Sequence, residues 1–294
     1  MVTCREGMVE VFVISVRSSD GRTIEAFDDG AGPAIVIIHG GMDDGRAWKK
    51  VADRLSDSYR VVRLRRRPYG LRAPTTMAQE VDDVLAVSEA VQGPKMLVGH
   101  SSGGVLALET MVASPKTFRG AVIYEPPVVL GPPVGGEATQ RVRAAIEAGK
   151  PGKAIAIFSQ HMLRLNPVQA RFVGLYAALH PRYRKLVHTQ LRVEEIDDLG
   201  VRLDEYAKLD VPVTLVSGSR SPGHLEERID VLVNTMPRSE KVVLKKQSHG
   251  AHLTAPDQLA VIARALATQV LPAKAPASTR RSVSRRSLRR NFPL

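Results

Sequence analysis

Residues 99–103 of this chain read G-H-S-S-G, and this short segment limits the possible folds more than any other feature. An apolar run, residues 96–98, precedes it, and the small and aliphatic residues 104–108 follow. A serine between two glycines, with a strand before it and a small-residue helix after it, is typical of a sharp strand-to-helix turn. Side chains two residues either side of Ser101 would collide with the strand and the helix. We therefore expect Ser101 at the end of a buried strand, with its hydroxyl above the sheet edge.

The same turn makes a prediction about the backbone after Ser101. Ser102 stands at the N-terminus of the predicted helix, where the helix dipole favours negative charge. Its N–H therefore faces the position where the oxyanion of a tetrahedral intermediate would form. The alternative interpretation of residues 99–103 is an ordinary turn rich in glycine and serine, and the surrounding segments must decide between the two.

Strand-like and helix-like patterns alternate on both sides of this turn. Two β-rich runs, residues 10–16 and 22–27, flank an S-D-G turn and predict a hairpin. Further apolar runs predict strands at residues 34–38, 59–64, 95–98, 121–124, 211–216 and 241–244. Periodic patterns predict helices at about residues 44–56, 76–91, 224–236 and 256–270, and another from the turn to residue 113. The alternation predicts an α/β fold with a doubly wound, mostly parallel sheet of eight strands.

The alternation stops after residue 125. Between residues 126 and 206 the chain shows only helical patterns, at residues 137–148, 151–164, 167–178 and 181–193. We interpret residues 126–206 as a helical cap inserted into a core formed by residues 1–125 and 207–270. The apolar residues of the cap, such as Phe158, Met162 and Phe172, are expected to pack on the core or to line a mostly apolar pocket.

Charge and composition bear on partners and location. The net charge is +12, and residues 271–294 contribute seven of these positive charges with no acid and no apolar periodicity. This tail is expected to be disordered, and it offers weak contact with a polyanion. The single cysteine, Cys4, excludes an internal disulfide framework. No signal-peptide pattern and no run of about 20 apolar residues is present, so we expect a cytoplasmic protein without a membrane span.

Three motifs in order resemble the α/β-hydrolase superfamily, and the resemblance covers about residues 9–270. Residues 39–41 (H-G-G) are similar to the family's oxyanion turn, and residues 99–103 are similar to its nucleophile elbow. Residues 248–256 (S-H-G-A-H-L-T-A-P) resemble its catalytic-histidine loop, which opens the last helix at a proline. The nucleophile comes first in the chain and the histidine last, as in this family.

The resemblance implies a set of catalytic roles. Ser101 would be the nucleophile, and because a serine hydroxyl is a poor nucleophile at neutral pH, it needs an imidazole to take its proton. His249 has the spacing expected of that base, while His252, one helical turn further, is the alternative and otherwise a packing residue. The amides of Gly41 and Ser102 would form the oxyanion hole.

The third member of the triad departs from the usual pattern. Most relatives carry an aspartate after the seventh strand, in G-x-x-D, whereas this chain reads G-S-R-S with Ser221 in that place. Some members of the family place the acid after the sixth strand, and there this chain has Glu125. The alternatives are that Glu125 is a hinge or salt-bridge residue, or that Ser101 and His249 act as a dyad.

The resulting interpretation is a serine hydrolase that cleaves an ester, lactone or thioester of a small, largely apolar substrate through an acyl-enzyme. The alternatives are hydrolysis of a carbon–carbon bond, cyclisation or a perhydrolase reaction in the same site, and a non-hydrolytic binding protein on the same scaffold. We expect no cofactor and no metal, since residues 249 and 252 offer a two-ligand spacing at best and no phosphate-binding glycine loop is present. The patterns set no oligomeric state.

Overall fold

The computed structural model describes residues 2–6, 9–67, 75–190 and 194–272. The basic tail predicted for residues 271–294 lies almost wholly outside the described residues. In the part of the chain that is described, no helix is long and apolar enough to cross a membrane. Nor do His, Cys, Asp and Glu side chains gather there in groups of three or more that could hold a metal ion.

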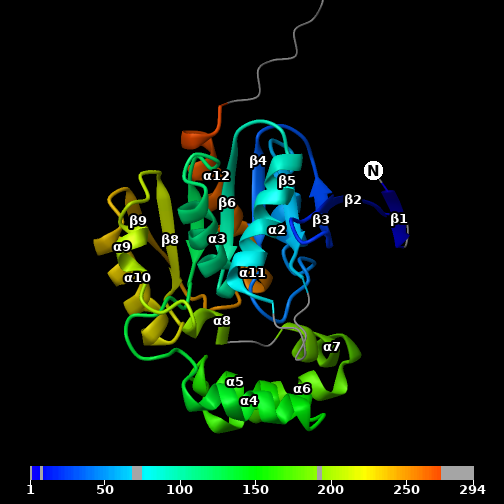
Figure 1. Ribbon diagram of the computed structural model, residues 1–294, viewed down its shortest axis with the longest axis vertical. Coiled ribbons are helices and arrows are strands. Elements are labelled where there is room, and N and C mark those ends of the chain that lie inside the picture. The colour runs from blue at the N-terminus through cyan, green and yellow to red at the C-terminus, as the bar shows by residue number, and fades with distance from the viewer. Residues whose placement is uncertain (1, 7–8, 68–74, 191–193, 273–294) are drawn as a thin grey trace, which may run out of the picture.

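One sheet runs through the centre of the molecule (Figure 1). Its strand order is β1-β2-β3-β5-β4-β6-β7-β8-β9. The strands are β1 (Val2–Glu6), β2 (Val9–Arg17), β3 (Thr23–Asp29), β4 (Ala34–Ile38), β5 (Arg60–Arg65), β6 (Lys95–His100), β7 (Ala121–Tyr124), β8 (Val213–Gly218) and β9 (Ser239–Leu244). Pairing is antiparallel from β1 to β5 and parallel from β5 to β9.

The eight predicted strands are all present, and the mostly parallel sheet is confirmed. A ninth strand, β1, extends the edge by pairing with the first half of β2. Its five residues are too few to carry a periodic signal, and their extended form depends on the free edge of the nine-residue β2. The helix predicted at residues 44–56 is shorter, Lys49–Leu55, because Gly45 has φ +83°, which a right-handed helix cannot contain.

Helices cover both faces of the sheet (Figure 1). Those on one face are α2 (Met77–Ala90), α3 (Ser102–Ala113), α9 (Leu203–Tyr206) and α10 (Gly223–Thr235); those on the other are α1 (Lys49–Leu55), α11 (Ala251–Thr254) and α12 (Pro256–Val270). Strand β4 shows how the sequence builds two apolar layers. Its side chains alternate, so Val36 and Ile38 join the first layer while Ile35 and Ile37 join the second.

Helices α4 (Glu137–Glu147), α5 (Pro151–His161), α6 (Pro167–Leu179), α7 (Pro181–Gln190) and α8 (Glu194–Asp197) lie between β7 and β8 in the chain. We call them the helical insert. It has a hydrophobic cluster of its own, which includes Val142, Ile155 and Val187. At its ends, Val129 and Ile196 belong to the core cluster instead, so both connections are packed against the sheet domain.

Candidate active site

The strand-to-helix turn has the predicted form. Strand β6 ends at His100, helix α3 begins at Ser102, and Ser101 lies between them with φ 52° and ψ −128°. A positive φ is unfavourable for a residue with a Cβ atom, and such strain persists only where the surroundings impose it. Here the Ser101 N–H donates to the carbonyl oxygen of Tyr124 at 2.9 Å, which ties the turn to the neighbouring strand β7.

Both glycines of the turn are required by close packing. A Cβ on Gly99 would lie 2.7 Å from the carbonyl oxygen of Gly103 and 2.8 Å from the Cβ of Ala107, in helix α3. A Cβ on Gly103 would fall on the carbonyl oxygens of Ile38 and His39, at the end of β4. The predicted collisions with helix and strand are therefore confirmed, and they bring the end of β4 against the turn.

The H-G-G turn that follows β4 lies directly beside Ser101. A Cβ on Gly40 would be 2.9 Å from the Cβ of Ser101. His39 is buried and neutral: its Nδ1–H donates to the Gly40 carbonyl oxygen at 2.7 Å, and its Nε2 accepts the Arg66 N–H at 3.2 Å. Burial lowers the pKa of His39, which suits a structural role in the turn. Gly41 follows at the same edge, and its role as an oxyanion donor stays a prediction.

Glu125 reaches His249. Its Oε2 accepts from Nδ1 of the His249 ring at 2.6 Å, although the two residues are 124 positions apart in the chain. The other oxygen, Oε1, accepts from the N–H of Gly218 at 2.7 Å, and the Glu125 backbone, at φ 46°, donates to Val216 at 3.0 Å. Glu125 is completely buried, so these contacts hold its carboxylate in one position. A carboxylate that accepts from Nδ1–H leaves Nε2 of His249 as the basic nitrogen.

Ser221 does not take the place of the acid. Its Oγ is buried and has no hydrogen-bond partner among the described residues. The carboxylate that contacts His249 therefore comes from the end of β7 rather than from the loop after β8.

The histidine loop is fixed next to Ser101 by the side chain before it. The Nε2–H of His100 donates to the carbonyl oxygen of His249 at 2.9 Å, and the two rings lie 4.6 Å apart between centroids. In the described part of the chain no hydrogen bond joins the Ser101 hydroxyl to the His249 ring. Such bonds are often long in unliganded sites and tighten when substrate binds.

His252, the alternative base, is a packing residue. Its ring stacks on Trp48 at 5.2 Å with an angle of 7° between the planes. Burial lowers the pKa of His252 to about 4, so the ring is neutral at pH 7. The carboxylate of Glu125 contacts His249, not His252.

One buried group beside the elbow was not predicted from the sequence. Arg66 pairs with Glu80 through Nε at 2.9 Å and Nη2 at 2.6 Å. Its Nη1 donates to the Oγ of Ser102 at 2.8 Å and to the carbonyl oxygen of His39 at 3.2 Å. The run of three arginines at residues 65–67 was the visible signal, but the spacing in the sequence does not indicate which partner each one meets.

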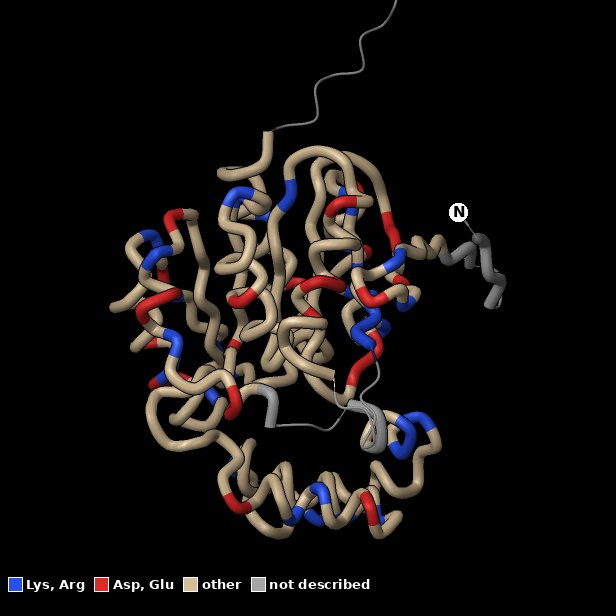
Figure 2. Tube along the Cα trace, in the orientation of Figure 1, with Lys and Arg blue, Asp and Glu red and all other residues tan. Residues whose placement is uncertain are grey.

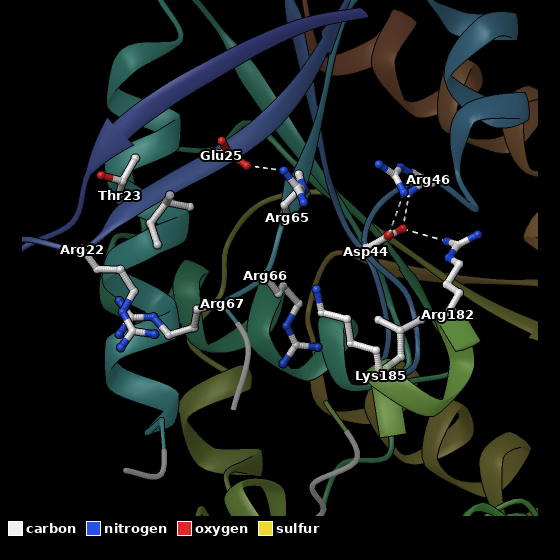
Figure 3. A pocket seen from close by; sticks show the side chains of 12 residues that line it. Arg22, Thr23, Glu25, Asp44, Arg46, Arg65, Arg66, Arg67, Arg182 and Lys185 are labelled. Carbon is white, nitrogen blue, oxygen red and sulfur yellow. Dashed lines mark hydrogen bonds and ion pairs between the residues drawn. The ribbon is translucent and has the colours of Figure 1, made fainter. Parts of the chain in front are cut away.

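Two cavities among the described residues differ in their lining. A cavity of about 590 Å³ between the sheet edge and α7 is lined mainly by basic side chains (Figure 3). A second cavity, of about 250 Å³, combines Leu130, Met162 and other apolar residues with charged ones such as Arg228. Phe172 of α6, expected to pack inward, is 68% exposed, because that helix packs on α5 through its small residues instead.

Comparisons with known proteins give one consistent result. The model of the alpha/beta hydrolase family matches residues 35–262. An (E)-2-((N-methylformamido)methylene)succinate hydrolase from Acinetobacter baylyi is 22% identical over 265 residues, which cover 83% of this chain and 94% of that protein. A pimeloyl-[acyl-carrier protein] methyl ester esterase from Aliivibrio fischeri is 26% identical over a region that covers 78% of this chain and 91% of that protein. The solved structure of an alpha/beta hydrolase from Sphaerobacter thermophilus superposes with a TM-score of 0.75 at 24% identity, covering 87% and 100% of the two chains. The likeness to this solved structure shows that the two proteins share a fold.

Proposed function

The chain belongs to the alpha/beta hydrolase family, a family of enzymes, and on that premise we propose that it is a serine hydrolase acting on an ester, lactone or thioester of a small molecule. Its relatives include hydrolases and esterases, which supports hydrolysis in general. The serine mechanism is our inference from the geometry around Ser101.

In the first half of the reaction, Nε2 of His249 takes the proton of Ser101 as Oγ attacks the carbonyl carbon. The carbonyl π electrons move to oxygen, and the amides of Gly41 and Ser102 stabilise that oxyanion. Glu125 keeps the proton of the neutral imidazole on Nδ1 and stabilises the imidazolium once it forms. Collapse of the intermediate breaks the bond to the leaving group, which receives its proton from Nε2 of His249.

In the second half, water replaces the leaving group. His249 takes a proton from the water as its oxygen attacks the acyl carbon, and a second tetrahedral intermediate forms in the same oxyanion hole. Its collapse releases the carboxylic acid and returns the proton to Ser101. The helical insert acts as a cap over this site, a role supported by Met42, which follows Gly41 and packs against the hydrophobic cluster of the insert.

The observation that carries the proposal is the contact between Glu125 and His249. A completely buried carboxylate, with one oxygen on a backbone N–H and the other on Nδ1 of a histidine, holds that ring in the tautomer a general base needs. A binding protein on this scaffold has no need of such an arrangement beside a serine at positive φ.

The test is covalent labelling, which needs no knowledge of the substrate. We expect a fluorophosphonate to add once to the protein, by intact mass, and Ser101→Ala and His249→Ala to abolish the adduct. Ser221→Ala is the matched control, because its hydroxyl is buried in the loop beside the site with no hydrogen-bond partner among the described residues, and it should label like the unchanged protein. No adduct on the unchanged, folded protein would contradict the proposal and favour a binding role.

A further inference from the structure

Helix α6 carries apolar side chains on two opposite sides. Its inner side consists of Ala170, Gly174 and Ala177, which are buried. Gly174 lies against Gly152 and Ala156 of α5, so this side packs on the neighbouring helix. The side chains of the other side are large and 51–68% exposed: Val168, Phe172, Leu175, Tyr176 and Leu179. We call these five residues the apolar stripe.

The apolar stripe follows the period of a helix. Its residues are separated by four, three, one and three positions, so they share one side of α6, opposite the small residues that face α5. The main packing partners of α6 are α5 and α7, both in the helical insert. Neither of the two cavities described above is lined by a residue of α6. Because a helix that is apolar all round is normally buried, the exposed stripe indicates a partner outside the chain's own core.

The charge of this part of the chain has one sign. Between Glu147 and Glu194 the sequence has no acidic residue and eight Lys or Arg residues. Figure 2 shows basic positions in the layer of α4, α5 and α6 and on α7. Five of these cations are exposed and make no ion pair with any described residue: Lys150, Lys153, Arg164, Arg171 and Arg184. Their charge is uncompensated within the fold, and it complements an anionic surface.

These features favour a lipid surface over a protein partner. A second copy of this chain would bring like charges together, because α6 and α7 contain no acid to pair with Arg171. Large side chains that project from one helix can enter lipid without a matching groove, which a protein partner would have to supply. The thirteen residues of α6 are too few to cross a bilayer, so the helix would lie along its surface. Tyr176 suits that position, since its ring is apolar and its hydroxyl is polar.

We propose that the apolar stripe and the cations beside it dock the protein on a membrane surface that contains anionic lipid. The stripe enters the boundary between headgroups and acyl chains, and Arg171 and Arg184 pair with headgroup phosphates. Both contributions are needed, because one short helix face binds neutral lipid only weakly and cations without apolar contact give adsorption that salt removes. The proposal does not depend on the serine mechanism, because it concerns the surface of the insert and not the contacts of Ser101.

The test measures binding of the full chain to two kinds of vesicle: equal parts of phosphatidylcholine and phosphatidylglycerol, and phosphatidylcholine alone. We expect binding to the first and about tenfold weaker binding to the second. Phe172→Gln/Leu175→Gln/Leu179→Gln should weaken binding to the anionic vesicles about 100-fold, because each substitution removes apolar surface that enters the lipid. The matched control is Val261→Gln, which changes a residue of α12 that is 67% exposed and should alter binding less than about twofold.

Two further measurements separate docking from simple attraction of charge. Arg171→Gln/Arg184→Gln should weaken binding to the anionic vesicles about tenfold, as expected for two cations near an anionic surface. Insertion is measured with Phe172→Trp and lipids that carry bromine on their acyl chains. The emission of that variant should be quenched on anionic vesicles, whereas the native Trp48, which is completely buried, should not respond. Adsorption through the basic residues 271–294 alone would leave this emission unquenched.

Three results would overturn the proposal. The first is a triple glutamine variant that is folded, by thermal unfolding, and binds anionic vesicles as well as the unchanged protein. The second is a Phe172→Trp emission that these vesicles do not quench, which would leave only adsorption through charge. The third is an unchanged protein that binds neither kind of vesicle. If light scattering then shows a dimer that the triple variant converts to monomers, a second copy covers the apolar stripe; if it shows a monomer, an acidic protein is the remaining partner to test.

Discussion

Replacing Glu125 by glutamine changes the atoms at one buried position and little else, so its effect can be worked out from the contacts of that side chain. One carboxylate oxygen accepts from Nδ1 of His249 at 2.6 Å and the other from the N–H of Gly218 at 2.7 Å. Glutamine has one acceptor oxygen and one NH₂ group. One of the two donors therefore faces an NH₂ group, whichever way the amide is turned.

The two orientations have different consequences. If the amide oxygen stays on His249, the Gly218 N–H is left buried without an acceptor, at a cost of about 1–3 kcal/mol. If it stays on Gly218, the NH₂ group faces Nδ1, and the imidazole moves its proton to Nε2 in order to accept. The second orientation is favoured, because the His249 ring can change its tautomer whereas the Gly218 peptide cannot move its N–H. In that orientation Nε2 of His249 carries the proton, so it cannot take the proton of Ser101. We expect kcat to fall about 10³–10⁴-fold, equivalent to about 4–5 kcal/mol of barrier.

The assay is the rate of fluorophosphonate labelling together with steady-state hydrolysis of a p-nitrophenyl ester. Thermal unfolding should show that Glu125→Gln remains folded, because glutamine has nearly the same shape as glutamate. Ser221→Ala should change either rate by less than about threefold, since its Oγ has no hydrogen-bond partner among the described residues. A folded Glu125→Gln protein that loses less than about tenfold would refute the argument that this carboxylate sets the tautomer of His249.

Three further predictions follow from packing and burial. Gly103→Ala should lower the free energy of unfolding by about 2–4 kcal/mol in urea, because its Cβ falls on backbone oxygens, while Gly131→Ala, with open space around it, should not. His252→Phe should keep its fluorophosphonate labelling. The pKa of His252 is about 4 in the folded protein and 6.5 ordinarily, so between pH 4 and pH 6.5 the unfolded state binds more protons than the folded state. The unchanged protein should therefore lose about 2 kcal/mol of stability from pH 7 to pH 5 through this residue, and the variant should not lose it. Arg66→Met should destabilise the fold by about 3–5 kcal/mol in urea, because it removes one partner of a buried ion pair, and adding Glu80→Leu should recover part of that loss.

The fold was accessible from the sequence because its signals are local. An apolar run with both faces buried, such as residues 34–38, predicts an interior strand wherever it occurs in the chain. The elbow at residues 99–103 combines such a strand with a glycine requirement that neighbouring atoms impose. Two features were missed: strand β1, and the late start, at Lys49, of the helix predicted at residues 44–56. Strand β1 depends on the free edge of β2, and the start of the helix depends on the backbone angle of Gly45.

The lining of the cavities could not be predicted in the same way. Periodicity identifies the apolar face of a helix but does not say what that face meets. Phe172 therefore seemed a core residue, whereas α6 buries Gly174 and Ala177 and exposes the aromatic ring. The cavity of about 590 Å³ likewise joins the end of β5 with α7, two segments more than a hundred residues apart.

By itself, the sequence determined the order of strands and helices, the turn at Ser101 and the candidate nucleophile, and it left two histidines of one loop as candidate bases, since each of these features depends on residues close together in the chain. It left three possibilities for the acid: Glu125, a residue at the position of Ser221, or none. The tertiary structure decided which carboxylate reaches the His249 ring, because the parallel order of β6, β7 and β8 brings together the ends of strands that are far apart in sequence. A distance of 2.6 Å across 124 residues is a property of the folded sheet, and no local pattern encodes it.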